Sequence, residues 1–160
     1  MTLKEQVNEL SCRVEEFVRC VDSLPGDSFL EKMDDWSPRD ILAHLIGWNR
    51  YTIEGSGQIR NGHIPFYLVD PGDDFSKVNA VLVRQYSSRD KRELLDELET
   101  SCQELKLFLL SLDPADWESD YGVRHQGFPV TIQNNVEGLI DDYLHHREQI
   151  EEWAKGLDGA

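Results

Sequence analysis

The stretch Asp141-Asp142-Tyr143-Leu144-His145-His146-Arg147-Glu148-Gln149-Ile150 lies in a segment with a helical pattern of apolar residues. The pattern recurs at alternating steps of four and three residues: Ile132, Val136, Leu139, Tyr143, His146, Ile150 and Trp153. A series of this kind is typical of the buried side of a packed helix. The sequence therefore predicts a long last helix with His146 at a core position.

Two acid and histidine pairs, each spaced by one helical turn, make this stretch dense in metal-ligand side chains. His146 belongs to the apolar series, and Asp142 lies at its edge on the same side. Asp141 and His145 lie around the helix, where we expect them to be exposed. A histidine at a core position needs partners for its ring nitrogens, so His146 is expected to be hydrogen-bonded or metal-ligating.

Three further segments carry apolar residues at helical spacing. The first follows the capping sequence Thr2-Leu3-Lys4-Glu5 and ends before Leu24-Pro25-Gly26. The second follows Ser37, and the third follows Ser87-Ser88-Arg89-Asp90 and runs to Leu112. A shorter helix is expected from Phe75 to about Tyr86. The pattern predicts an all-α fold, an up-down four-helix bundle, as one domain over residues 1–160.

The second helix supplies another candidate ligand. Ser37-Pro38-Arg39-Asp40 places a capping hydroxyl, a proline and an acid at its start, and we expect it to run to about Gly55. His44 borders the apolar face of this helix and should point inward. One interpretation is a hydrogen-bonded core histidine. The other is a set of His44, Asp142 and His146, which suits a divalent transition metal with positions left open for water or substrate.

Two long segments lack a helical pattern. Gly55–Asp74 is rich in glycine and proline, and we expect a long ordered loop or a lid there. A hairpin is one interpretation of part of residues 113–130. Within that segment, Arg124 and His125 are candidates to reach a substrate at the mouth of the bundle, the alternative being two hydrated surface side chains.

Charge and cysteine content limit the classes of partner. Asp and Glu number 31 against 16 Lys and Arg, a formal net charge of −15. Such a surface repels phosphate backbones and anionic membranes, so we expect neither nucleic acid nor membrane as a partner. The three cysteines lack paired spacing, which is typical of reduced thiols, and the charged N-terminal segment is unlike a signal peptide. We therefore expect a soluble cytoplasmic protein.

The stretch Trp36-Ser37-Pro38-Arg39-Asp40-Ile41-Leu42-Ala43-His44-Leu45-Ile46-Gly47-Trp48, with His146-Arg147-Glu148-Gln149-Ile150, resembles the DinB/YfiT-like superfamily of four-helix bundles. The resemblance covers nearly the whole chain. It implies metal ligands at His44, Asp142 and His146, a divalent metal such as zinc, nickel or iron, and a homodimer.

Two positions depart from the motif of this superfamily. Asp142 stands where the middle ligand is usually histidine, and Glu148 stands where glycine is usual. Maleylpyruvate isomerases that use mycothiol resemble this chain in having an acid at the middle position. The resemblance therefore implies a metal of open identity and, as one option, a low-molecular-weight thiol cosubstrate.

Other parts of the chain resemble the ClbS/DfsB-like proteins, from Gly47-Trp48 and Val78-Asn79-Ala80 to the helix around Leu94–Glu99. That branch implies a metal-independent hydrolase or a small-molecule-binding resistance protein. Our first expectation is a divalent-metal-dependent hydrolase or thiol-dependent transferase acting on a small molecule. A non-catalytic bundle with a structural histidine network is the third alternative. Trp48 and Tyr143 join the candidate substrate contacts.

Overall fold

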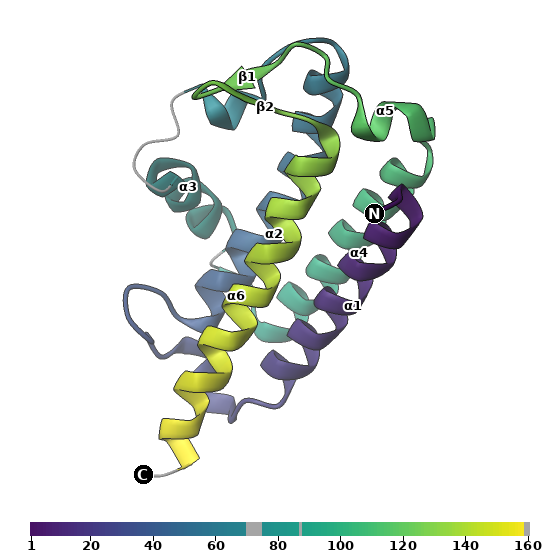
Figure 1. The fold of residues 1–160 in the computed structure, drawn as a ribbon. Helices are drawn as coiled ribbons and strands as arrows, with labels where there is room; N and C mark the ends of the chain where they lie inside the picture. Colours follow the sequence, from purple (N-terminus) through teal and green to yellow (C-terminus); the bar gives the residue numbers. More distant parts are fainter. Residues whose placement is uncertain (70–74, 87, 159–160) are drawn as a thin grey trace.

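Four long helices pack around a shared apolar core in the computed structural model: α1 (Leu3–Asp22), α2 (Pro38–Arg60), α4 (Lys91–Leu110) and α6 (Ile132–Asp158) (Figure 1). The structure describes residues 1–69, 75–86 and 88–158. The apolar residues expected along α6 are buried, apart from a partly buried Trp153. The expected all-α four-helix bundle is confirmed.

Polar caps begin three of these helices as the sequence predicts. Thr2 and Ser37 each form a reciprocal capping box, with Glu5 and Asp40 respectively. For α4 the capping residue is Asp90, whose side chain accepts a hydrogen bond from the backbone N–H of Glu93. These caps satisfy N–H groups that have no partner inside their helices, so the starts of α1, α2 and α4 are fixed locally.

The four long helices form two parallel pairs. Ion pairs join Arg50 to Glu97 and Arg60 to Asp116, so α2 and the α4–α5 segment run in the same direction. The segment that contains α3 (Ser76–Tyr86) returns the chain to the end at which α2 begins (Figure 1). The long helices α2 and α4 can therefore run in the same direction because α3 lies between them. The predicted alternation of direction holds along the chain when α3 is counted. Helix α6 runs antiparallel to α2, and the candidate ligands lie between these two helices.

The second helix is longer than expected, because it continues through Gly55 to Arg60. Gly55 does not end the helix. It lets the ring of Tyr67 approach, since a Cβ atom there would lie 2.4 Å from the Tyr67 hydroxyl. The helix ends before Gly62, which has a φ of +78°, a conformation that favours glycine at a helix C-terminus. The first part of the predicted Gly55–Asp74 loop is thus helical, and residues 70–74 of it lie outside the described residues.

Short elements close the two ends of the bundle. The connection after α2 contains a 3₁₀ turn, Phe66–Leu68, and another 3₁₀ turn, Gly26–Leu30, follows α1. The segment between α4 and α6 contains α5 (Pro114–Glu118), β1 (Arg124–His125) and β2 (Phe128–Pro129). The strands pair antiparallel, with His125 opposite Phe128, so the hairpin is confirmed. No helix in the described ranges is both long and apolar enough to cross a bilayer.

Candidate metal centre

His44 of α2 and the Asp142 and His146 side chains of α6 meet between the two helices. One ligand atom from each lies within 4.8 Å of the other two. His44 Nε2 is 2.7 Å from Asp142 Oδ2, and His146 Nε2 is 3.2 Å from Asp142 Oδ1. Both histidines are buried, with 4% and 8% of their surface exposed. Asp141 and His145, the competing pair, are exposed on α6 as the periodicity predicts.

The outer nitrogen of each ring has its own partner. His44 Nδ1 lies 3.0 Å from Asn79 Oδ1, which also accepts a hydrogen bond of 2.8 Å from the indole N–H of Trp48. Because an indole N–H can only donate, the amide oxygen of Asn79 faces both rings, and Nδ1 of His44 carries the proton. His146 Nδ1 lies 3.0 Å from Gln149 Oε1. These contacts orient Nε2 of each ring toward Asp142.

Asp142 is the negative centre of the group. Burial opposes its ionisation, but the hydrogen bonds with His146 and His44 outweigh burial and hold the pKa of its carboxyl well below the usual range. The donor set is therefore two imidazole nitrogens and one carboxylate, converging on one small volume. This set fits zinc, nickel or iron in its divalent state, because imidazole is a preferred ligand of all three.

Aromatic side chains surround the histidines. Trp36, just before α2, lies with its ring centroid 5.1 Å from that of His44 and 6.3 Å from that of His146. Trp48 lies one turn after His44 and contacts Phe75 edge-on, at a centroid distance of 5.7 Å. Phe75 has a φ of 63°, which is unusual for a bulky residue. Asp142 and the two rings thus lie in a largely apolar setting, where electrostatic interactions are strengthened.

A pocket of about 340 Å³ opens beside His44 and Asp142. We call it the α2–α6 pocket, after the helices that form its long walls. The α2 side includes Trp48 and Thr52, and the α6 side includes Asn135 and Asp142. Tyr67, Leu68, Phe75 and Asn79 complete the lining. A small molecule in this pocket would contact Asp142 and His44 directly.

The other predicted substrate contacts have different positions. Trp48 lines the α2–α6 pocket, whereas Tyr143 is fully buried and donates a hydrogen bond of 2.7 Å to Asn49 Oδ1. Arg124 is exposed on the hairpin and pairs with Asp120 at 2.7 Å. His125 is half-buried in the same hairpin, which precedes α6 in the sequence. The structure therefore brings Trp48 to the pocket and leaves the other three outside its lining.

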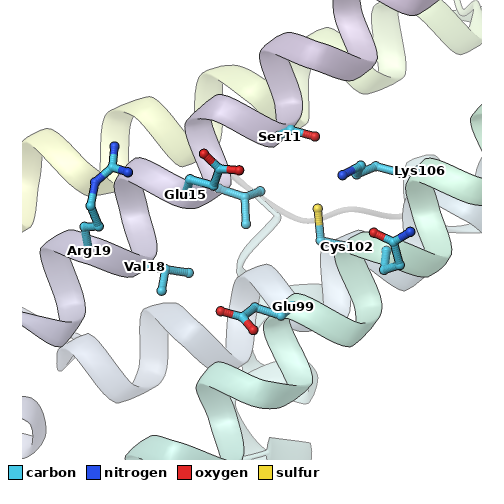
Figure 2. Close-up of a pocket in the computed structure, with 9 residues that line it drawn as sticks. Ser11, Glu15, Val18, Arg19, Glu99, Cys102 and Lys106 are labelled. Atoms are coloured by element: carbon cyan, nitrogen blue, oxygen red, sulfur yellow. The ribbon is translucent and has the colours of Figure 1, made fainter.

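A second cavity, of about 380 Å³, lies between α1 and α4 (Figure 2). Glu15 and Glu99 stand on opposite sides of it, and the thiol of Cys102 points from α4 toward α1. Burial raises the pKa of the Cys102 thiol to about 11, so this sulfur is protonated at neutral pH. Glu15, Glu99 and Cys102 line this cavity, but among the described residues the group of three whose ligand atoms converge within 4.8 Å is His44, Asp142 and His146. The group of His44, Asp142 and His146 is therefore the better candidate for a metal site.

Solved structures show the same fold at low sequence identity. An uncharacterized protein from Clostridium difficile 630 matches with a TM-score of 0.80 and 16% identity, over 97% of this chain and 96% of that one. The colibactin self-resistance protein ClbS, in complex with a dsDNA, matches with a TM-score of 0.78 and 13% identity, over 96% of each chain. A mycothiol-dependent maleylpyruvate isomerase matches with a TM-score of 0.74 and 16% identity, over 94% of this chain and 61% of that one.

Comparison of sequences places the chain in a family. No curated protein matches it. The family model of the DinB superfamily matches residues 9–150, which include His44, Asp142 and His146. This match spans most of the chain and agrees with the helical fold, so the protein belongs to the DinB superfamily.

Proposed function

We propose that this protein is a divalent-metal-dependent enzyme that acts on a small molecule in the α2–α6 pocket, as a hydrolase or a thiol-dependent transferase. The observation that carries the proposal is the convergence of His44 Nε2, His146 Nε2 and the Asp142 carboxylate within 4.8 Å, beside a pocket. Structural histidines satisfied within a core need no such opening.

The ligands in this proposal are His44, Asp142 and His146. A divalent metal held there supplies acidity, because it lowers the pKa of a bound water or thiol toward neutrality. Asn79 and Gln149 hold the two imidazole rings by their outer nitrogens, which keeps Nε2 of each ring free to act as a ligand. Trp48 and Tyr67 restrict where a substrate can lie beside Asp142. The protein itself thus contributes ligands, their orientation and a shaped pocket.

The thiol-dependent option draws support from one structural neighbour, the mycothiol-dependent maleylpyruvate isomerase. A second candidate function uses the same residues without a metal, as in a small-molecule resistance protein. The 2.7 Å contact between His44 and Asp142 favours it, because it lies within hydrogen-bond distance and holds the two side chains together without a metal. The neighbour ClbS is named as a self-resistance protein, which also fits this candidate.

One structural neighbour, ClbS, was solved in complex with a dsDNA. The present chain has a net charge of −15, which opposes contact with a phosphate backbone. We therefore propose a small molecule as the substrate. The homodimer and the cytoplasmic location stay predictions.

Metal analysis of tag-free protein tests the proposal. After growth with zinc, nickel and iron supplied, we expect about one divalent metal ion per chain, with open positions for substrate. His44→Ala and His146→Ala should lose the metal, while His145→Ala, which changes an exposed neighbour, should keep it. Wild-type protein that stays metal-free under these conditions would contradict the proposal. Activity that survives chelation would instead favour the metal-independent candidate.

A further inference from the structure

We infer that the α2–α6 pocket selects a flat molecule about 10 Å long whose body carries no negative charge. This inference rests on the proposed function for the reactive end of the pocket, at His44 and Asp142. It adds the substrate class, which neither the family nor the structural neighbours assign to this chain.

The length follows from the spacing of the lining residues along the two helices. On α2, His44, Trp48 and Thr52 lie on successive turns and all line the pocket. On α6, Asn135 precedes Asp142 by two turns. At a rise of 1.5 Å per residue, each row spans roughly 10 to 12 Å. A molecule that contacts both ends therefore has about the length of two fused or linked rings.

The flat shape follows from the aromatic side chains between these ends. Trp48 contacts Tyr67 edge-on, with ring centroids 4.9 Å apart, and contacts Phe75 in the same way at 5.7 Å. Tyr67 is buried, while Trp48 and Phe75 are only half-buried. The rings of Trp48 and Phe75 thus offer apolar surface that a planar ligand can cover.

The far end of the pocket offers neutral hydrogen-bonding groups. Thr52, Asn134 and Asn135 line it. The amide oxygen of Asn135 accepts a hydrogen bond of 2.7 Å from the Tyr67 hydroxyl, whereas its Nδ2 is buried without a partner. The amide oxygen has a second lone pair, which can accept a hydrogen bond from a substrate O–H or N–H group. Carbonyl, amide and hydroxyl groups match this end.

The charge preference follows from the lining. No described residue that lines the pocket is Lys or Arg, and residues 70–74, outside the described ranges, contain neither. Asp142 gives the pocket a negative charge at the reactive end. A carboxylate or phosphate on the body of the substrate would lose its water there without gaining a positive partner, which is costly. Uncharged molecules avoid that penalty.

A matched pair of probes tests the inference. Biphenylcarboxamide and biphenylcarboxylate have nearly the same length and shape and differ in charge. Calorimetric titration of the full chain after chelation should show the amide binding at least about tenfold more tightly. Asn135→Leu should weaken the amide, and Asn135→Lys should reverse the preference. If Asn135→Lys does not fold, Asn134→Lys makes the same test at an exposed position.

The controls separate this inference from the proposed function. Val18→Phe, which fills the cavity between α1 and α4, should leave binding of both probes unchanged. Protein that is metal-free as purified would contradict the metal proposal, and a preference for the amide in that protein would leave this inference intact. Equal or tighter binding of the carboxylate after chelation, or failure of the amide to bind, would overturn the inference whatever the metal content.

Discussion

His44 Nε2 and Asp142 Oδ2 lie 2.7 Å apart, although 98 positions separate the two residues in the sequence. The contact joins α2 to α6 and pairs a buried imidazole with a half-buried, charged acceptor. Hydrogen bonds to charged groups contribute more to stability than neutral ones do. The same side chain contacts His146 through its other oxygen. Asp142 is therefore the one described residue that touches both histidines through ring nitrogens.

Asp142→Asn should destabilise the protein even when no metal is present. The substitution keeps the shape but removes the charge that both Nε2 atoms face, so we expect a loss of about 1 to 3 kcal/mol in the free energy of unfolding. Asp141→Asn changes the exposed neighbouring acid and should alter stability by less than about 0.5 kcal/mol. Urea unfolding of chelated protein measures both. Equal midpoints for the two variants would refute a stabilising role for Asp142.

Asn79→Leu should weaken metal binding although it changes none of the three proposed metal ligands. The side chain loses the oxygen that accepts from His44 and Trp48, so the His44 ring is no longer fixed. Loss of such outer partners typically lowers metal affinity about 10- to 100-fold. Asn134→Leu, a pocket position without contact to either histidine ring, is the control. Competition with a chromogenic chelator measures the affinities, and matching values for Asn79→Leu and wild type would count against this role.

Gly55→Ala and Gly57→Ala should have opposite effects on stability. Both glycines lie inside α2, but a Cβ atom at position 55 would meet Tyr67 at 2.4 Å, whereas one at position 57 would have no atom within 4 Å. We expect the first substitution to cost about 1 to 3 kcal/mol, and the second to stabilise by about 0.5 to 1 kcal/mol. Thermal unfolding distinguishes them. A neutral Gly55→Ala would mean that Tyr67 does not pack on α2.

The core side of α6 could be predicted because it depends on one repeating pattern. The 3.6-residue period of a helix separates His146 from His145 and Asp142 from Asp141 without any knowledge of neighbouring helices. The inward side of His44 follows from the same rule. If the apolar faces of α2 and α6 pack together, His44 lies close to Asp142 and His146. The three residues could therefore be predicted as one group.

The outer partners could not be predicted in this way. Asn79 contacts His44 because α3 crosses α2 where Gly47 lets Leu82 approach, and no local pattern encodes that crossing. The continuation of α2 past Gly55 could not be predicted for a related reason, since a glycine needed for close packing looks the same in a sequence as one that ends a helix. The pocket wall formed by Tyr67 likewise depends on a tertiary contact.

The cysteines should differ sharply in reactivity at neutral pH. Cys12 is exposed, whereas Cys20 is half-buried and Cys102 is buried. Burial is the main cause that raises the pKa of both the Cys20 and the Cys102 thiol to about 11. At pH 7 only about one in ten thousand of either thiol is then ionised, and the thiolate is the reactive form.

We therefore expect iodoacetamide at pH 7 to modify Cys12 first. Between pH 7 and 9 the rate at Cys102 should rise about tenfold per pH unit, because the thiolate fraction grows in that proportion below a pKa of about 11. Peptide mapping by mass spectrometry gives the rate at each site, and a Cys12→Ser variant isolates the slower sites. Modification of Cys102 as fast as that of Cys12 at pH 7 would mean that its thiol is activated. The cavity between α1 and α4 would then offer a nucleophile, and the chemistry assigned to the histidine site would have a competitor.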